Sequence, residues 1–270
     1  MRYILEIIAA ISLFIIGNWF AIDELRPELL GMSIGVVIAL SIELLNWVYS
    51  KKKFIPLYWD CYKPFSRSEI RISIAYLFKI EDNGKYLLIR SKRLKNLFQP
   101  VGGVYKYFPD AETEIQKLGV TTDNKIANDP ISRYDLRLKL KDKSKLPKFL
   151  SWFLSKQKRE LDPWREFYEE LVKDCHLSEE EFKYIGYELI GQDFTRIHFS
   201  EHFQIDEFLF ADIYKPKFVN TQQQKIFENL RNSQHIDILW ATEDEIKQER
   251  TVEGKTIAPH SKKIFNTDIL

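Results

Sequence analysis

Three glutamates near the middle of the chain have the types and spacing to do metal chemistry. Residues 162–174 begin with an Asp-Pro pair, an N-cap followed by a first-turn proline, so we expect a helix here. On that helix Glu166, Glu169 and Glu170 share one face, where carboxylates repel one another unless a cation lies among them. This pattern predicts bound Mg²⁺ or Mn²⁺, which prefer oxygen ligands. The alternative is a solvated acidic face, relieved by ion pairs with residues such as Arg165.

The elements around this helix indicate one α+β domain. Alternating residues predict strands at 71–80 and 85–90, which we expect to pair as a hairpin about the turn Asp82-Asn83-Gly84. An extended run then ends in Pro-Val-Gly-Gly at residues 100–103, and residues 105–160 show no clear alternation. Beyond the acidic helix, the pattern predicts strands near 184–193, 202–214 and 236–240, and helices near 222–231 and from residue 242 onward.

Two of these motifs resemble a known family. Residues 165–170, Arg-Glu-Phe-Tyr-Glu-Glu, resemble the core of the Nudix box, whose pattern is Arg-Glu, an apolar residue, any residue and Glu-Glu. Residues 98–103, Phe-Gln-Pro-Val-Gly-Gly, resemble the bend that leads into that box. The resemblance implies a Nudix-like mixed sheet flanked by helices over residues 70–270, carrying a basic insertion at about 105–160.

The resemblance also implies roles for individual residues. The three glutamates would bind the metal, with Glu169 and Glu170 catalytic in an active hydrolase, and Arg165 would orient them. In a nucleotide receptor, the ligand would bind against Gly102, Gly103 and Arg165. Glu201 and Glu207 are the candidates for the family's further acidic residue.

The chain departs from the Nudix pattern at three points. Between Gly103 and Arg165 lie 61 residues, where the family normally keeps about a dozen. Gln157 occupies the position of the outlying glutamate, and Val172 occupies the position of a glycine. These departures favour a binding domain over an efficient hydrolase.

Two apolar stretches precede the domain, at residues 3–22 and 29–49, and each is long enough to cross a bilayer as a helix. The polar residues 23–28 between them predict a tight transmembrane hairpin. Lys51-Lys52-Lys53, with Arg2 at the other end, predicts that both termini lie on the cytoplasmic side of the membrane. A cleaved signal peptide and a buried core hairpin are the alternatives. Residues 50–69 would then be a stiff juxtamembrane linker.

Gly31, Gly35, Ala39 and Glu43 recur every four residues along the second stretch. Small residues at this spacing let a second helix approach closely. A carboxylate within the hydrocarbon layer is costly, so we expect Glu43 to face a partner helix, to be protonated or to line a water-filled pore. These four residues, called the seam below, either pack the two helices of the hairpin against each other or mediate homo-oligomerisation when the protein is activated.

A two-helix anchor joined to a divergent Nudix domain is similar to the SMODS-associated NUDIX effectors of bacterial CBASS antiphage systems. That resemblance implies a partner nucleotidyltransferase whose cyclic nucleotide is sensed by the Nudix-like domain. The transmembrane helices would then disrupt the bacterial inner membrane and cause abortive infection. A membrane-bound, Mg²⁺-dependent pyrophosphohydrolase acting on a nucleoside diphosphate derivative is the alternative function, and a silent membrane scaffold is a third.

Residues 133–159 carry ten Lys or Arg and two Asp. Apolar residues lie among them, so the segment could lie on an anionic leaflet, cover a nucleotide phosphate, or be a solvated insertion. The apolar residues are Leu146, Phe149, Leu150, Trp152, Phe153 and Leu154.

The overall charge is balanced, with 40 basic and 39 acidic residues, so we expect no nucleic-acid polymer as a partner. The cysteines, Cys61 and Cys175, match no motif and suit a reducing cytoplasm. His198 and His202 are four residues apart in a strand-like segment, and we expect them to be structural or surface residues rather than metal ligands.

Overall fold

The computed structural model of the 270-residue chain divides into two compact units, Met1–Pro56 and Leu57–Leu270. The structure describes residues 26–63, 69–92, 96–123, 132–174, 176–232, 235–267 and 269, together with residues 12, 15 and 19. The predicted first membrane span at residues 3–22, apart from those three positions, and Cys175 therefore lie outside the described residues.

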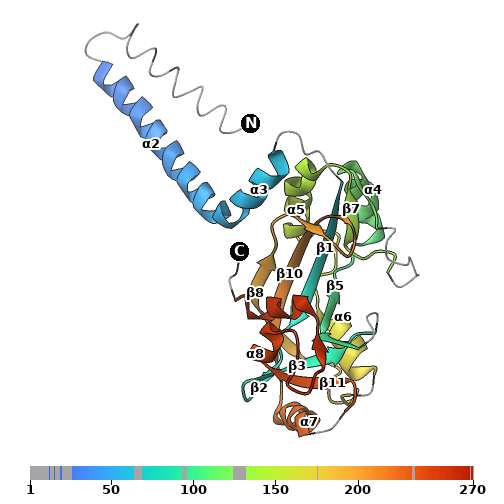
Figure 1. Cartoon of the computed structure of the whole chain (residues 1–270). Coiled ribbons are helices and arrows are strands. Elements are labelled where there is room, and N and C mark those ends of the chain that lie inside the picture. Colours follow the sequence, from blue (N-terminus) through green and yellow to red (C-terminus); the bar gives the residue numbers. More distant parts are fainter. Residues whose placement is uncertain are drawn as a thin grey trace. The chain divides into compact units, whose positions relative to one another are not determined.

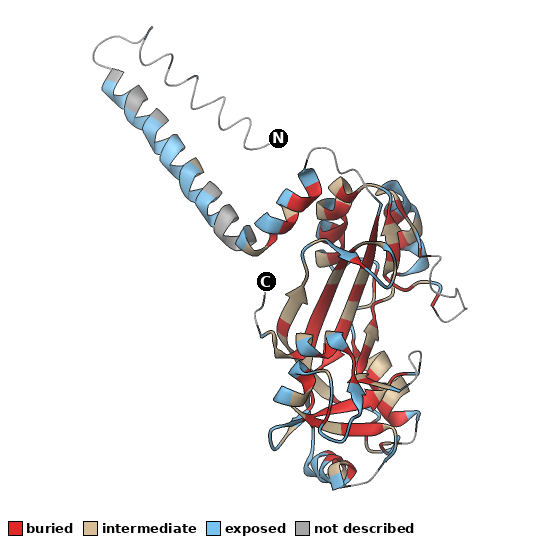
Figure 2. Ribbon diagram, in the orientation of Figure 1, coloured by how far each residue is buried: buried red, intermediate tan, exposed pale blue. Residues whose placement is uncertain are grey.

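In the first unit, the second predicted span lies within a 26-residue helix, α2 (Arg26–Lys51) (Figure 1). Several of its large apolar side chains are more than half exposed, and Figure 2 shows the helix mostly in the colour of exposed residues. The four seam residues, Gly31, Gly35, Ala39 and Glu43, are all exposed. Among the described residues, no helix meets the combined length and hydropathy expected of a membrane span. The transmembrane hairpin therefore stays a prediction.

Helix continues through much of the predicted linker. A short 3₁₀ turn, η2 (Lys52–Phe54), leads into α3 (Ile55–Tyr62). In α3 the side chains of Leu57, Asp60 and Cys61 are buried. The linker is therefore helical up to Tyr62, and part of it belongs to the packed domain.

The larger of two sheets in the second unit contains the longest strands. Its described strands run in the order β6-β7-β1-β10-β8, with β5 also paired to β1 and β9 to β10. β1 and β10 are parallel, and the other pairs are antiparallel. The strands are β1 (Ile70–Phe78), β5 (Gly102–Val104), β6 (Val120–Thr122), β7 (Arg137–Leu140), β8 (Gly186–Phe194), β9 (His198–Ser200) and β10 (Ile205–Lys217).

The smaller sheet runs in the order β11-β3-β4-β12 among the described strands, with β2 paired to β3. It contains β2 (Glu81–Asp82), β3 (Lys85–Arg90), β4 (Leu97–Pro100), β11 (Ile238–Thr242) and β12 (Thr256–Ile257). The predicted hairpin between residues 71–80 and 85–90 is wrong, because β1 and β3 belong to different sheets. The turn at Asn83-Gly84 joins β3 only to the two-residue β2, and the chain crosses from one sheet to the other just before it.

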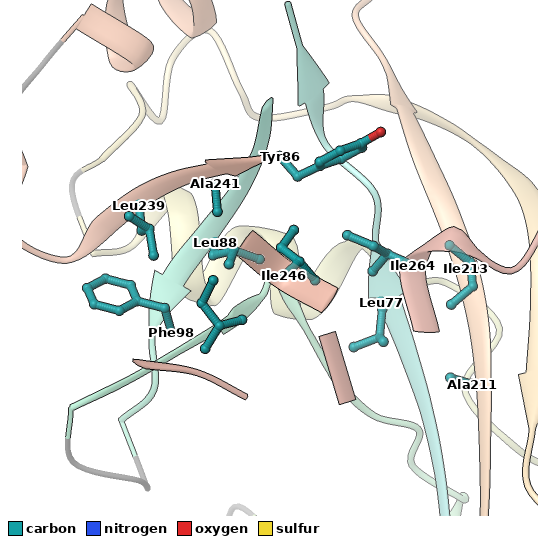
Figure 3. Close-up of a cluster of buried hydrophobic side chains, with 11 residues drawn as sticks. Leu77, Tyr86, Leu88, Phe98, Ala211, Ile213, Leu239, Ala241, Ile246 and Ile264 are labelled. Carbon is teal, nitrogen blue, oxygen red and sulfur yellow. The ribbon is translucent and has the colours of Figure 1, made fainter. Parts of the chain in front are cut away.

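Apolar side chains from both sheets meet in one cluster (Figure 3). Leu77 and Ile213 come from the larger sheet, Leu88 and Leu239 from the smaller one, and Ile246 from α8 (Glu243–Lys247). The remaining helices are α4 (Glu112–Lys117), α5 (Leu146–Leu154), α6 (Trp164–Phe167), α7 (Thr221–Asn232) and the helical turns η3 (Pro109–Ala111), η4 (Lys143–Lys145), η5 (Tyr168–Val172) and η6 (Pro259–Phe265).

The segment 105–160, predicted as a basic insertion, packs into the domain through buried side chains of its own. Its strands β6 and β7 extend the larger sheet beside β1. In α5, five of the six apolar residues that suggested contact with a leaflet are at most 7% exposed. They are Leu146, Phe149, Leu150, Trp152 and Phe153. Because these side chains pack inside the domain, they are not available to a lipid surface.

Candidate functional site

The acidic segment is helical as expected, but its second half is a π-helix. Asp162 Oδ1 accepts a hydrogen bond of 2.8 Å from the backbone N–H of Trp164, where α6 begins. The helix then widens into η5, which carries Glu169 and Glu170. π-helical turns are rare and occur frequently at functional sites, because the extra residue redirects the side chains around it. Phe167 and Leu171 are fully buried and hold the segment against the domain.

Arg165 lies among three carboxylates. Its Nε is 2.8 Å from Glu160 Oε1, and its Nη1 is 2.5 Å from Glu166 Oε1 and 3.7 Å from Glu169 Oε2. Its Nη2 donates to the carbonyl oxygen of Val104 at 3.0 Å. The guanidinium therefore joins the acidic helix to strand β5 and fixes the positions of two of the predicted metal-binding glutamates.

The Gly-Gly bend meets the acidic helix despite the long insertion between them. Gly102 donates its backbone N–H to Glu170 Oε2 at 2.9 Å. A Cβ at Gly103 would overlap the side chain of Glu166, so glycine is required for the observed approach. Gly102, Gly103, Arg165, Glu166 and Glu170, all predicted site residues, are therefore neighbours in space.

The carboxyl of Glu170 has a raised pKa. Burial raises the pKa of its carboxyl to about 8, with a smaller contribution from Glu166, although the Gly102 hydrogen bond opposes the shift. At neutral pH the carboxyl is therefore mostly protonated, and it can donate as well as accept a hydrogen bond.

The three glutamates do not converge on one point. Glu166 and Glu169 turn toward Arg165, and Glu170 turns toward Gly102. In the described part of the chain, no group of three or more His, Cys, Asp or Glu side chains is arranged to hold a metal ion. Carboxylates are suitable ligands for Mg²⁺ or Mn²⁺, but this arrangement does not form a three-carboxylate site, and the metal stays a prediction.

A pocket of about 370 Å³ lies beside Glu170. This volume is within the usual range for small-molecule sites, roughly 300–1,000 Å³. Four of its charged groups form ion pairs, since Lys92 Nζ is 2.7 Å from Asp174 and Arg90 Nε is 2.8 Å from Asp237. The lining is Ile89, Arg90, Ser91, Lys92, Glu170, Asp174, His176, His235 and Asp237.

Two imidazoles meet in this pocket. The rings of His176 and His235 are edge to face, with centroids 4.4 Å apart. Burial, and then the neighbouring His235, lowers the pKa of His176. The Nδ1 of His176 is buried and has no hydrogen-bond partner among the described residues. The pocket therefore offers an uncharged imidazole beside the mostly protonated carboxyl of Glu170.

Several of these residues were not identified from the sequence. Glu160 contacts Arg165 from five positions before it, three residues after Gln157, where the Nudix pattern has its glutamate. Its Oε2 also accepts from the backbone N–H of Lys106, a contact that only the folded insertion can supply. The two histidines lie 59 positions apart in the sequence, so spacing gave no signal.

Glu201 and Glu207 are not near the bend. Glu207 is buried, lies opposite Arg71 in the β1–β10 ladder and accepts from its guanidinium at 3.1 Å. Gly102 pairs with Leu77, six residues further along β1, or roughly 20 Å away. Glu201 lies in the turn between β9 and β10, next to the same end of the ladder.

His198 lies 3.4 Å from Glu207, and the His202 ring packs on Phe203.

A mixed sheet paired with a smaller one, and a glycine bend held against an Arg-Glu-x-x-Glu-Glu helix, define a Nudix-like α+β domain. The family model of the SMODS-associated NUDIX domain matches residues 69–265, and the chain belongs to this family. No curated protein and no solved structure matches the chain.

Proposed function

We propose that this protein is a membrane-anchored effector of a CBASS antiphage system. Its Nudix-like domain binds a cyclic nucleotide made by a partner nucleotidyltransferase, and its N-terminal helices disrupt the bacterial inner membrane, which causes abortive infection. Family membership supports the association with SMODS nucleotidyltransferases. The exposed apolar side chains of α2 support the anchor, because such a surface needs lipid or a partner helix.

The observation that carries the proposed ligand class is the pocket beside the glycine bend. The pocket borders Glu170, whose carboxyl also binds the backbone N–H of Gly102. A protonated carboxyl and a neutral imidazole donate and accept hydrogen bonds without a net charge, which suits the edge of a nucleobase. Phosphates bound at Gly102, Gly103 and Arg165 would compete with Glu170 for the Gly102 N–H and with the surrounding carboxylates for the Arg165 guanidinium.

Binding without hydrolysis is favoured by the state of the carboxylates. Arg165 neutralises Glu166 and Glu169, and burial keeps Glu170 mostly protonated at neutral pH. Three ionised carboxylates facing one metal would require all of these contacts to change. Binding of a nucleobase edge in the pocket beside Glu170 needs no three ionised carboxylates.

Titration calorimetry on the full-length chain in lipid nanodiscs tests this proposal. A panel of cyclic di- and trinucleotides would be titrated in the presence of Mg²⁺, and the same mixtures would be analysed by chromatography for products. We expect micromolar or tighter binding of at least one cyclic nucleotide with no turnover. Absence of binding across the panel would contradict the sensor.

A membrane-bound, Mg²⁺-dependent pyrophosphohydrolase is the second candidate, favoured by the retained Arg-Glu-x-x-Glu-Glu motif. Nucleotide sugars and other nucleoside diphosphate derivatives belong in the same panel. Turnover that Glu169→Gln or Glu170→Gln abolishes, with the fold intact by circular dichroism, would establish the enzyme instead.

A further inference from the structure

Helix α3 (Ile55–Tyr62) has two chemically different faces. Leu57 is fully buried and Cys61 is 3% exposed, so one face packs into the domain. Trp59 and Tyr62, three residues apart on the other face, are 70% and 63% exposed. Two large aromatic side chains this exposed, on a helix that is otherwise packed, leave an apolar surface without a partner in the described structure.

The helix is held in a fixed rotation by an ion pair. Arg196, between β8 and β9, donates from Nε to Asp60 Oδ2 at 2.8 Å and from Nη2 to Asp60 Oδ1 at 2.6 Å. The hydrogen bond from Arg196 lowers the pKa of the Asp60 carboxyl, so the pair stays charged at neutral pH. A bidentate contact fixes orientation as well as distance, and it keeps Trp59 and Tyr62 directed outward.

The residues flanking this face suit an anionic lipid surface. Lys51-Lys52-Lys53 precede α3 and Lys63 follows it, which places cations at both ends of the aromatic pair. Trp and Tyr are the residues enriched where a protein meets the membrane–water interface, because their rings are amphipathic. A second copy of the same face is a poorer partner, since a two-fold contact would bring its lysines together.

We propose that α3 is an interfacial helix, whose Trp59–Tyr62 face lies in the headgroup region of the inner membrane while its buried face and Arg196 hold it to the Nudix-like domain. This inference rests on the proposed membrane anchoring. It goes beyond that proposal because it identifies α3 as the part of the Nudix-like domain that contacts the membrane surface. Movements of the strands next to Arg196 would be transmitted to the bilayer surface through α3.

Depth-dependent quenching of a fluorescent label tests the proposal on the full-length chain in nanodiscs containing anionic lipid. Single cysteines would be introduced by Trp59→Cys, Tyr62→Cys, Ile38→Cys in α2, and Tyr184→Cys in the Nudix-like domain, all with Cys175→Ser. Cys61 is kept, because burial raises the pKa of its thiol to about 12 and keeps it unreactive. Tyr184 is the matched control, an aromatic residue that is 72% exposed.

We expect labels at positions 59 and 62 to be quenched severalfold more by headgroup nitroxides than by mid-chain nitroxides. The label at position 38 should be quenched more by mid-chain nitroxides than by headgroup nitroxides. The label at position 184 should be quenched by neither. If positions 59 and 62 behave like 184 while 38 is quenched, the interfacial helix is wrong and the anchor stands. If 38 is not quenched either, the anchor itself fails. Self-quenching between labels at 59 without lipid quenching would assign the face to a second copy and overturn the proposal.

Discussion

The glycines of the bend show how closely single residues are constrained in this site. Gly102 has a φ of +152°, a conformation that other residues rarely adopt, and a Cβ there would overlap the backbone carbonyl oxygen of Tyr76. Strand β1 cannot move away without losing its pairing with neighbouring strands, so the steric overlap cannot relax at low energetic cost.

Gly102→Ala should therefore lower the free energy of unfolding by about 3 kcal/mol. Gly84→Ala is the matched control: its φ is +72° and its Cβ would meet open space, so we expect a loss of only about 1 kcal/mol. Urea unfolding of both variants measures the difference. Equal losses would show that the close approach to Tyr76 is not what requires glycine.

Glu170 makes stability depend on pH in an unusual direction. Its pKa is about 8 in the folded protein, above the ordinary value of 4.5, so the folded state retains a proton that the unfolded chain releases. Stability from this group is therefore present at low pH and declines as the pH rises from about 4.5 to 8.

Glu170→Gln removes that titration while keeping the shape of the side chain. Between pH 5 and pH 8, the melting temperature of the variant should fall less than that of the wild type. Differential scanning fluorimetry across this range compares them. Parallel curves for the two proteins would show that the carboxyl is ionised in the folded state.

Among the elements, helix α5 shows how the insertion contributes to the domain. Phe153 is fully buried, and its ring centroid is 5.5 Å from that of Tyr105 and 5.4 Å from that of Phe210. The Arg159 guanidinium lies 3.8 Å from the centroid of the same ring. Tyr105 in turn donates to the buried Asp212 at 2.6 Å, so α5 covers a polar network on the larger sheet.

Phe153→Ala should destabilise the domain by about 3–5 kcal/mol, because it opens a cavity between α5 and β10. Leu161→Ala serves as the control: Leu161 is 53% exposed, and its loss should cost less than about 0.5 kcal/mol. Thermal unfolding of the two variants distinguishes an integral insertion from a solvated one, for which both changes would be mild.

Elements with strong local signals were predictable from the sequence. The strand 85–90 matches β3, the helix 222–231 lies within α7, and α8 begins at a capping box of Thr242 and Glu245. The partners of β1 were not predictable, because strand alternation does not say which sheet a strand joins. The short strands β6 and β7 were missed for a similar reason, since three or four residues give no measurable period.

The candidate site was partly predictable. The motif resemblance brought Arg165, Glu166 and Gly103 together correctly, although 61 residues separate Gly103 from Arg165. It could not supply Glu160 or the histidine pocket, which depend on contacts between distant segments. Nor does the spacing of the glutamates reveal the π-helical turn that carries two of them.

At the scale of the whole molecule, the proposed receptor domain follows an apolar helix in the chain. Gly31 and Gly35 face open space among the described residues, and Glu43 is exposed on the same helix, α2. In a bilayer, small residues at this spacing permit close helix packing, and a carboxylate among them favours a water-filled pore. We expect ligand-driven association of the receptor domains to bring the seams of several copies together.

Release of a trapped dye from liposomes tests this central claim most directly. Full-length protein would be reconstituted in liposomes of inner-membrane lipid composition, and a cyclic nucleotide that it binds would be added. We expect rapid release only with the nucleotide, and much slower release for Gly35→Leu or Glu43→Gln at unchanged nucleotide affinity. Retention of the dye by the wild-type protein with saturating nucleotide would contradict this claim.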